Sequence, residues 1–128
     1  MYNNLSVFFF LLMLLIATDV KSQQEDLSAY KWENRLVVVQ NSTLSDGPFL
    51  EQAKRLAPLD VSFEDRKLKL IDQRGVAHTN KGFQVLLIGL DGGVKARKEN
   101  SFFSREELFV LIDSMPMRRY ELEQNSPN

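Results

Sequence analysis

The hydrophobic positions of the chain fall into runs that differ in how polar residues interrupt them. Residues 35–39 and 83–90 are almost continuously apolar, which is typical of strands covered on both faces in a parallel or mixed sheet. Residues 67–72 and 94–98 alternate apolar side chains with lysine or arginine, as edge strands do when they are protected from pairing with other chains. The pattern therefore predicts two central strands and two edge strands.

The segment between the first two predicted strands has the spacing of an amphipathic helix. Asp46, Gly47 and Pro48 suit its start, because aspartate caps helices and proline fits the first helical turn. We expect the helix to end before Pro58. Its predicted apolar face comprises Phe49, Leu50, Ala53, Leu56 and Ala57. The first strand, this helix and the second strand predict one βαβ unit.

A second helix is predicted near the C-terminus. Ser104 and Glu107 form a Ser-x-x-Glu capping box, apolar residues follow at helical spacing, and Pro116 stops the turn. From Arg118 onward the chain is polar, so we expect frayed chain there, with residues 121–128 as a flexible tail.

The order of these elements, βαβ followed by ββα, predicts a thioredoxin-like α/β domain with a four-stranded mixed sheet and helices packed on it. Asp91, Gly92 and Gly93 supply the hairpin turn between the last two strands. In this arrangement the strand order is 2-1-3-4, which places the two apolar strands in the centre of the sheet. We assign the domain to residues 23–120.

The first segment has the features of a targeting signal. The apolar run from Val7 to Ala17 is shorter than a membrane-spanning helix, and Val20 and Ser22 are small enough to precede a cleavage site. We therefore predict a signal peptide over residues 1–22, cleaved after Ser22, and an exported chain that is periplasmic or extracellular. No basic residue precedes the apolar run, which departs from the usual pattern, and a retained N-terminal anchor is the alternative.

Composition excludes several classes of chemistry. The 128 residues carry 16 Lys+Arg against 17 Asp+Glu, so no basic field favours nucleic acid as a partner. The absence of cysteine excludes thiol nucleophiles, disulfides and dithiol exchange, and with one histidine it excludes Cys/His zinc sites. Acidic residues such as Asp65 and Asp72 lack calcium-loop spacing and are expected on the solvated surface. We expect no metal, no cofactor and no catalytic residue.

The position of the thioredoxin active site, where the first strand meets the first helix, reads Asp46-Gly47-Pro48-Phe49. Thioredoxins place Cys-Gly-Pro-Cys there because the helix N-terminus lowers the pKa of the nucleophilic thiol. The Gly-Pro pair is present, but neither sulfur is. Thiol–disulfide exchange by this chain alone is therefore excluded.

The same helix start holds the candidate binding residues. Ser42, Ser45, Asp46 and Gly47 lie where backbone N–H groups and the helix dipole can hold an anion. An enzyme that reuses this end of the fold through Ser42, Ser45, Asp46 and His78, without thiol chemistry, is the alternative function.

Asn41 begins the sequence Asn41-Ser42-Thr43, which is an N-glycosylation sequon. It has meaning only if the host glycosylates its secreted proteins.

Two segments resemble a known family. Residues Phe83–Arg97 and Leu108–Arg119, with the ending Met115-Pro-Met-Arg-Arg119 as the most specific part, resemble a domain of unknown function. That domain is shared by the extracellular sushi-repeat proteins, the matrix protein called down-regulated by oncogenes, and small exported bacterial proteins. The resemblance covers about Leu27 to Glu123 and implies a thioredoxin- or peroxiredoxin-like fold in an exported protein. It implies no activity, substrate or catalytic residue.

The predicted sheet needs cover on both faces, yet its two helices share one face. The other face must be covered by residues 27–32, by residues 59–63 or by another molecule. We therefore predict a non-catalytic binding module with a protein partner, and without a stable membrane span once the signal is cleaved.

Overall fold

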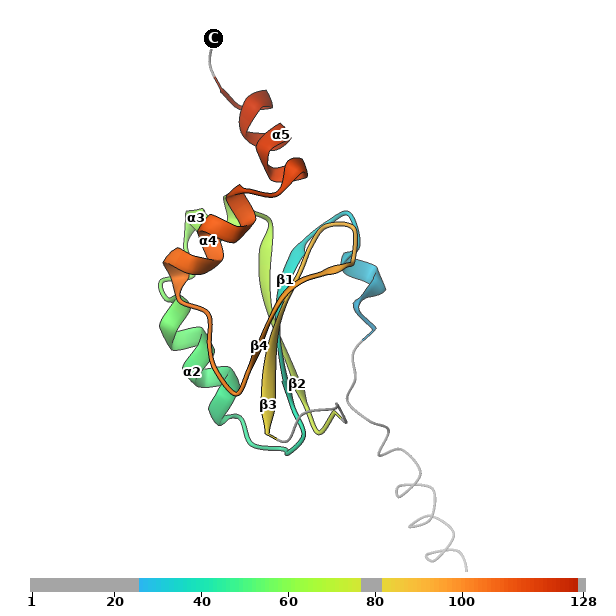
Figure 1. Cartoon of the computed structure of the whole chain (residues 1–128), viewed down its shortest axis with the longest axis vertical. Helices are drawn as coiled ribbons and strands as arrows, with labels where there is room; N and C mark the ends of the chain where they lie inside the picture. The colour runs from blue at the N-terminus through green and yellow to red at the C-terminus, as the bar shows by residue number, and fades with distance from the viewer. Residues whose placement is uncertain (1–25, 77–81, 127–128) are drawn as a thin grey trace, which may run out of the picture.

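The computed structural model describes residues 26–76 and 82–126, and the predicted signal peptide at 1–22 lies outside them. The described chain is a mixed α/β fold (Figure 1). Its helices are η1 (Leu27–Tyr30, a 3-10 turn), α2 (Gly47–Leu56), α3 (Val61–Asp65), α4 (Arg105–Asp113) and α5 (Pro116–Gln124). Its strands are β1 (Arg35–Asn41), β2 (Leu68–Arg74), β3 (Phe83–Ile88) and β4 (Val94–Glu99). None of the described helices is long and apolar enough to cross a membrane.

The strands form one four-stranded sheet in the order β2-β1-β3-β4, which confirms the predicted thioredoxin-like order. Strand β1 is parallel to β2, with Arg35 opposite Leu68, and antiparallel to β3, with Leu36 opposite Ile88. Strands β3 and β4 are antiparallel. The central strands β1 and β3 are buried along almost their whole length, which explains why their sequences are continuously apolar.

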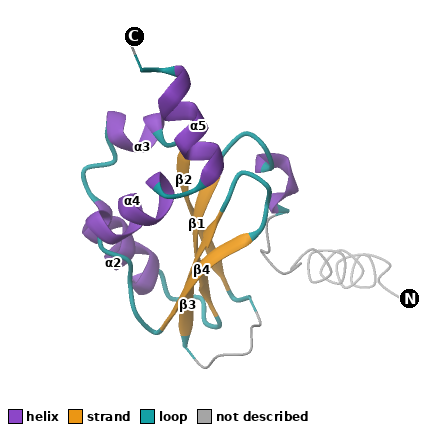
Figure 2. Cartoon of the chain, turned by 45° about the horizontal axis from the view of Figure 1, so that its top comes forward, coloured by secondary structure: helices purple, strands orange, loops and turns teal. Residues whose placement is uncertain are grey.

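The main hydrophobic core lies on one face of the sheet. Figures 1 and 2 show α2, α3 and α4 on this side. Alternate residues of the central strands point into it, and the helices supply the matching apolar side chains. Its buried members are Val37, Val39, Leu56, Phe63, Leu68, Val85, Leu87, Phe103, Leu108 and Ile112. The helix predicted over 46–57 is confirmed, but its face is rotated: Leu50 is 55% exposed, whereas Gln52 is fully buried.

The opposite face holds a smaller core, and of the three predicted covers it is residues 27–32 that lie on it. Its buried apolar residues are Leu36, Val38, Ile71, Leu86 and Ile88, against which Leu27 and Tyr30 of η1 pack. All five are at most 8% exposed, so this face is covered within the chain and gives no reason to expect a partner. Residues 59–63 do not cover it, because Phe63 belongs to the main core on the other side.

The C-terminal segment also differs from the prediction. Helix α4 forms as expected, with the Ser104 hydroxyl accepting a hydrogen bond from the Glu107 N–H at 3.1 Å. The prediction that the chain frays from Arg118 onward is wrong for residues up to Gln124, because Pro116 begins a further helix, α5. The side chain of Arg118 is buried in this segment and forms ion pairs with Asp65 and Asp113. A hydropathy pattern does not reveal such contacts.

Candidate binding site

The predicted site residues lie together at the C-terminal end of β1, but the hydroxyls of Ser42 and Ser45 form hydrogen bonds to the backbone around them. The Ser42 hydroxyl donates to the Gly82 carbonyl at 3.0 Å, and the Ser45 hydroxyl accepts from the Gly47 N–H at 3.2 Å. Asp46 occupies the N-cap position without a side-chain capping bond, so the predicted aspartate cap is wrong. His78, the fourth residue of the alternative enzyme, lies outside the described residues.

Asn41 is buried and organises the same loop. Its amide Nδ2 donates to the Ser45 carbonyl at 3.0 Å, and its Oδ1 accepts from the Thr43 N–H at 3.1 Å. The Asn41 side chain is buried, so the folded chain leaves no room for a glycan on Nδ2. In the folded chain Asn41 is therefore a structural residue of this turn.

Asp72 of β2 is a titratable group near this loop that the sequence assigned to the solvated surface. Its carboxylate is largely buried, and Oδ1 has no hydrogen-bond partner among the described residues. Burial raises the pKa of Asp72, the ion pair with Arg74 at 2.9 Å opposes that rise, and Asp46 adds to it.

A second constellation lies at the N-terminal end of β1, the opposite end of the strand. Arg35 is 1% exposed, although it is the first residue of the strand. Its Nη1 and Nη2 donate to the two carboxylate oxygens of Glu121 at 3.2 and 3.1 Å, and Nη1 also donates to the Arg66 carbonyl. Helix α5 thus neutralises a buried cation in the first strand.

Arg118 is the centre of the same ionic cluster. It is 2% exposed, and its guanidinium donates to Asp113 Oδ1 at 3.1 Å and to the Asp65 carbonyl at 2.9 Å. Arg66 donates to both oxygens of Asp113, at 3.0 and 2.8 Å. Burial alone would raise the pKa of Asp113, but the hydrogen bonds from Arg66 and Arg118 outweigh it and lower that pKa. The cluster joins α3, α4, α5 and β1.

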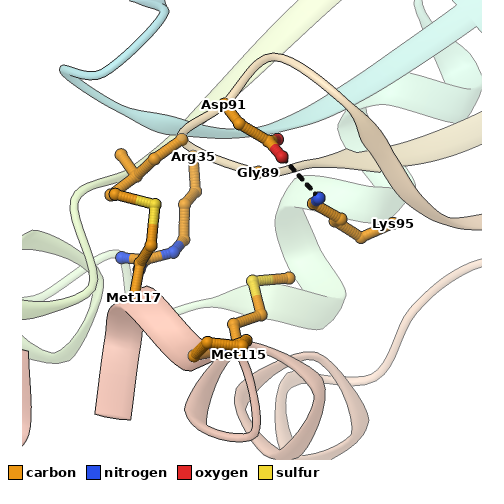
Figure 3. Close-up of a pocket in the computed structure, with 8 residues that line it drawn as sticks. Arg35, Gly89, Asp91, Lys95, Met115 and Met117 are labelled. Atoms are coloured by element: carbon orange, nitrogen blue, oxygen red, sulfur yellow. Dashed lines mark hydrogen bonds and ion pairs between the residues drawn. The ribbon is translucent and has the colours of Figure 1, made fainter. Parts of the chain in front are cut away.

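Arg35 also lines a cavity of about 230 Å³. Figure 3 shows Arg35 and Met117 on one side of it and Lys95 with Met115 on the other. The remaining lining residues are Gly89, Leu90, Asp91 and Pro116. The Arg35 Nε is buried in the described chain without a hydrogen-bond partner. The cavity therefore combines apolar walls with one unsatisfied cationic donor.

The β3–β4 turn supplies the other charges of this cavity. Lys95 Nζ donates to Asp91 Oδ2 at 2.8 Å. That bond, followed by the bond from the Gly93 N–H, lowers the pKa of Asp91, so this carboxylate stays ionised beside Lys95.

A wider hollow of about 450 Å³ adjoins the cavity and shares Leu90, Pro116 and Met117 with it. Its other lining residues are Trp32, Lys67, Tyr120 and Glu121. Trp32 is 57% exposed and Tyr120 is 63% exposed. We call the cavity and the hollow together the α5 groove.

The fold and these cavities define a class: a cysteine-free α/β domain with thioredoxin-like strand order and a groove between the C-terminal helix and the β3–β4 turn. Residues 72–121 match the family model described as a domain of unknown function, DUF4174. The match includes β3, β4, α4, Arg118 and Glu121, whereas Arg35 lies outside it. No solved structure matches the chain significantly.

The residues of the groove were not among the predicted site residues. Among the described residues, no three Asp, Glu, His or Cys side chains lie together as a metal site. One signal did point to the groove: the segment Met115-Pro-Met-Arg-Arg119 supplies three of the cavity's lining residues and the centre of the ionic cluster.

Proposed function

We propose that this chain is an exported, non-catalytic module that binds a protein partner through the α5 groove. The observation that carries the proposal is the exposure of Trp32, Met117 and Tyr120 around one hollow. Tryptophan, tyrosine and methionine are enriched in protein interfaces, where a few such side chains supply most of the binding energy. Their apolar surface is the reason to expect a partner on this side of the molecule.

The charges around the groove favour an acidic partner. Four cations line or border it: Arg35, Lys67 and Lys95, and Lys31, whose ammonium lies 5.5 Å from the Trp32 ring centroid. Two carboxylates line it, and both already hold ion pairs, Asp91 with Lys95 and Glu121 with Arg35. A segment that carries carboxylates beside apolar side chains is complementary to this surface.

The enzyme alternative has less support. A hydrolase at the C-terminal end of β1 would need a serine hydroxyl that donates its proton to a base, but the Ser42 hydroxyl donates to the Gly82 carbonyl and the Ser45 oxygen accepts from the Gly47 N–H within the loop.

Export is supported by the sequence. The apolar run of residues 7–17 has the length of a signal-peptide core, and the resemblance to the sushi-repeat and small exported proteins points the same way. We propose cleavage after Ser22 and a periplasmic or extracellular location. The test is the intact mass of the protein purified from its own host: a chain that begins at Gln23 is expected, and one that retains residues 1–22 overturns the cleavage.

Site-directed crosslinking tests the binding surface. A photoreactive benzoylphenylalanine replaces Tyr120 in the groove or, as a control, Val110, which is 70% exposed on α4 away from the groove. We expect a partner to be captured from position 120 only, and to be lost when Trp32→Ser is added. Equal capture from both positions, or capture that survives Trp32→Ser, contradicts the proposal.

A further inference from the structure

Among the nitrogens of the Arg35 guanidinium, only Nε has no hydrogen-bond partner in the described chain. Both Nη groups donate to Glu121, and Nη1 also donates to the Arg66 carbonyl. A buried N–H without an acceptor is unfavourable, and more so when it belongs to a charged group. Arg35 lines the 230 Å³ cavity but Nε itself is buried, so an acceptor that enters the cavity can satisfy this donor once the adjoining methionine side chains shift.

We propose that this cavity is a binding site for a carboxylate attached directly to a small apolar body. The site takes such a ligand whether or not the chain also has a protein partner. It therefore goes beyond the function proposed above, although both use the α5 groove.

The charges of the cavity select a carboxylate over a neutral acceptor. Hydrogen bonds between ionised partners are stronger than those between neutral groups. Lys95 Nζ has three donors and spends one on Asp91, so it can also donate to a ligand. Asp91 and Glu121 already pair with Lys95 and Arg35, so these four charges offset one another and a carboxylate is favoured through direct hydrogen bonds to the unused donors.

The remaining walls select the apolar body and its size. Leu90, Met115, Pro116 and Met117 line the cavity, and methionine side chains adapt to the shape of a ligand. A dry cavity of about 150 Å³ holds benzene. A cavity of about 230 Å³ therefore has room for benzoate or for the last residue of a peptide such as leucine.

Gly89 positions Lys95 in this site. A Cβ at residue 89 would lie 2.6 Å from Lys95 Cε, so a side chain there would make the lysine shift from its present path toward Asp91. Gly89 and Lys95 together place the second cation of the cavity.

The experiment follows the Arg35 Nε–H signal by NMR in the ¹⁵N-labelled protein. Benzoate is the probe, and benzamide is its neutral counterpart of the same shape. We expect benzoate to shift the Arg35 Nε–H resonance until it saturates, and benzamide to bind about tenfold more weakly, because it lacks the charge. Equal binding of the two compounds, or an Arg35 signal that does not move, overturns the proposal.

Matched lysine variants test the second cation. Lys95→Met should weaken benzoate binding about fivefold, whereas Lys98→Met should leave it unchanged, because Lys98 pairs with Glu107 outside the cavity. Gly89→Ala should reproduce part of the Lys95→Met effect. Arg35 stays in place throughout, since its loss would also leave Glu121 unpaired. Equal weakening by Lys95→Met and Lys98→Met contradicts a role for Lys95 in the site.

Two sources can supply this ligand, a free small acid or the C-terminus of a peptide. N-acetyl-leucine, acetyl-alanyl-alanyl-leucine and the C-terminal amide of that peptide separate them. If the ligand is a chain end that lies along the α5 groove, the peptide acid binds more tightly than N-acetyl-leucine. The Trp32→Ser variant then loses this difference in affinity. Equal affinities identify a free acid. A peptide amide that binds as well as the peptide acid contradicts the carboxylate site.

If crosslinking at position 120 fails while benzoate binds, the protein-partner proposal fails and this site stands.

Discussion

Gln52 shows how a polar side chain can be part of a core. It is fully buried in α2, and its amide exchanges two hydrogen bonds with the backbone of Phe103, each of 2.9 Å. The amide thereby satisfies a buried N–H and a buried C=O in the loop before α4.

Gln52→Met keeps the size of the side chain and removes both bonds. Each of the two buried backbone groups left unsatisfied costs about 1–3 kcal/mol, so we expect the free energy of unfolding to fall by about 2–6 kcal/mol. Urea titration measures it. Gln124→Met, at an exposed position of α5, is the control and should change stability by less than about 0.5 kcal/mol. Similar losses in both variants would show that the bonds to Phe103 are not stabilising.

Arg118 and Arg119 form a natural matched pair, because they are neighbours in one helix and only the first is buried. Arg118→Met leaves Asp113 and Asp65 without this partner, and we expect a loss of about 3 kcal/mol. Arg119→Met should lie within about 0.5 kcal/mol of the native protein. Both values come from urea titrations, and equal effects would contradict the cluster.

Asp113 makes stability depend on pH in a defined direction. Its pKa is lowered from 3.8 in the folded chain, so its carboxylate contributes stability above the unfolded value, and that contribution is lost as pH falls through the folded pKa. We expect Asp113→Asn to be less stable than the native protein near pH 7 and the difference to vanish at acid pH. Urea titrations across this range measure the difference, and a gap that does not change with pH contradicts the assignment.

Among the elements, α5 is the one whose length decides whether the cluster is complete. A chain that ends after Tyr120 lacks Glu121 and leaves Arg35 buried without a carboxylate, so we expect a loss of about 3 kcal/mol. A chain that ends after Gln124 keeps the helix and should be within about 0.5 kcal/mol of the full chain. Thermal and urea unfolding compare them. If the shorter chain is as stable as the longer, residues 121–124 are a tail after all.

Elements with a regular hydrophobic pattern could be predicted, whereas α3, with Phe63 as its buried residue, and α5, which is stabilised by charge, could not. β1 and β3 leave continuous apolar runs in the sequence because the sheet covers them on both faces. Helix α5 has no such pattern, since its buried contacts are ion pairs. The partner of Glu121 is Arg35, 86 residues earlier, and no local spacing connects them. The groove escaped prediction for the same reason, because it depends on where α5 packs.

At the scale of the whole molecule, the sheet ends in two charged edges. Strand β4 exposes Arg97 and Glu99, and charges on an edge strand oppose pairing with another sheet. We expect Arg97→Val combined with Glu99→Val to cause concentration-dependent association, measured by sedimentation velocity, while the native chain shows none at the same concentrations. An unchanged sedimentation coefficient in the double variant would show that these charges do not guard the edge.

The link between Arg35 and Glu121 also bears on how the chain is made. A ribosome releases Arg35 long before Glu121, which follows 86 residues later. Until α5 emerges, the sheet would have to bury Arg35 of β1 without the carboxylate of Glu121. Asp65 of α3 and Asp113 of α4 also lack their ion-pair partner Arg118 until then. The growing chain therefore has little reason to close its sheet early. We therefore expect the sheet to close only when α5 has been synthesised and Glu121 can meet Arg35.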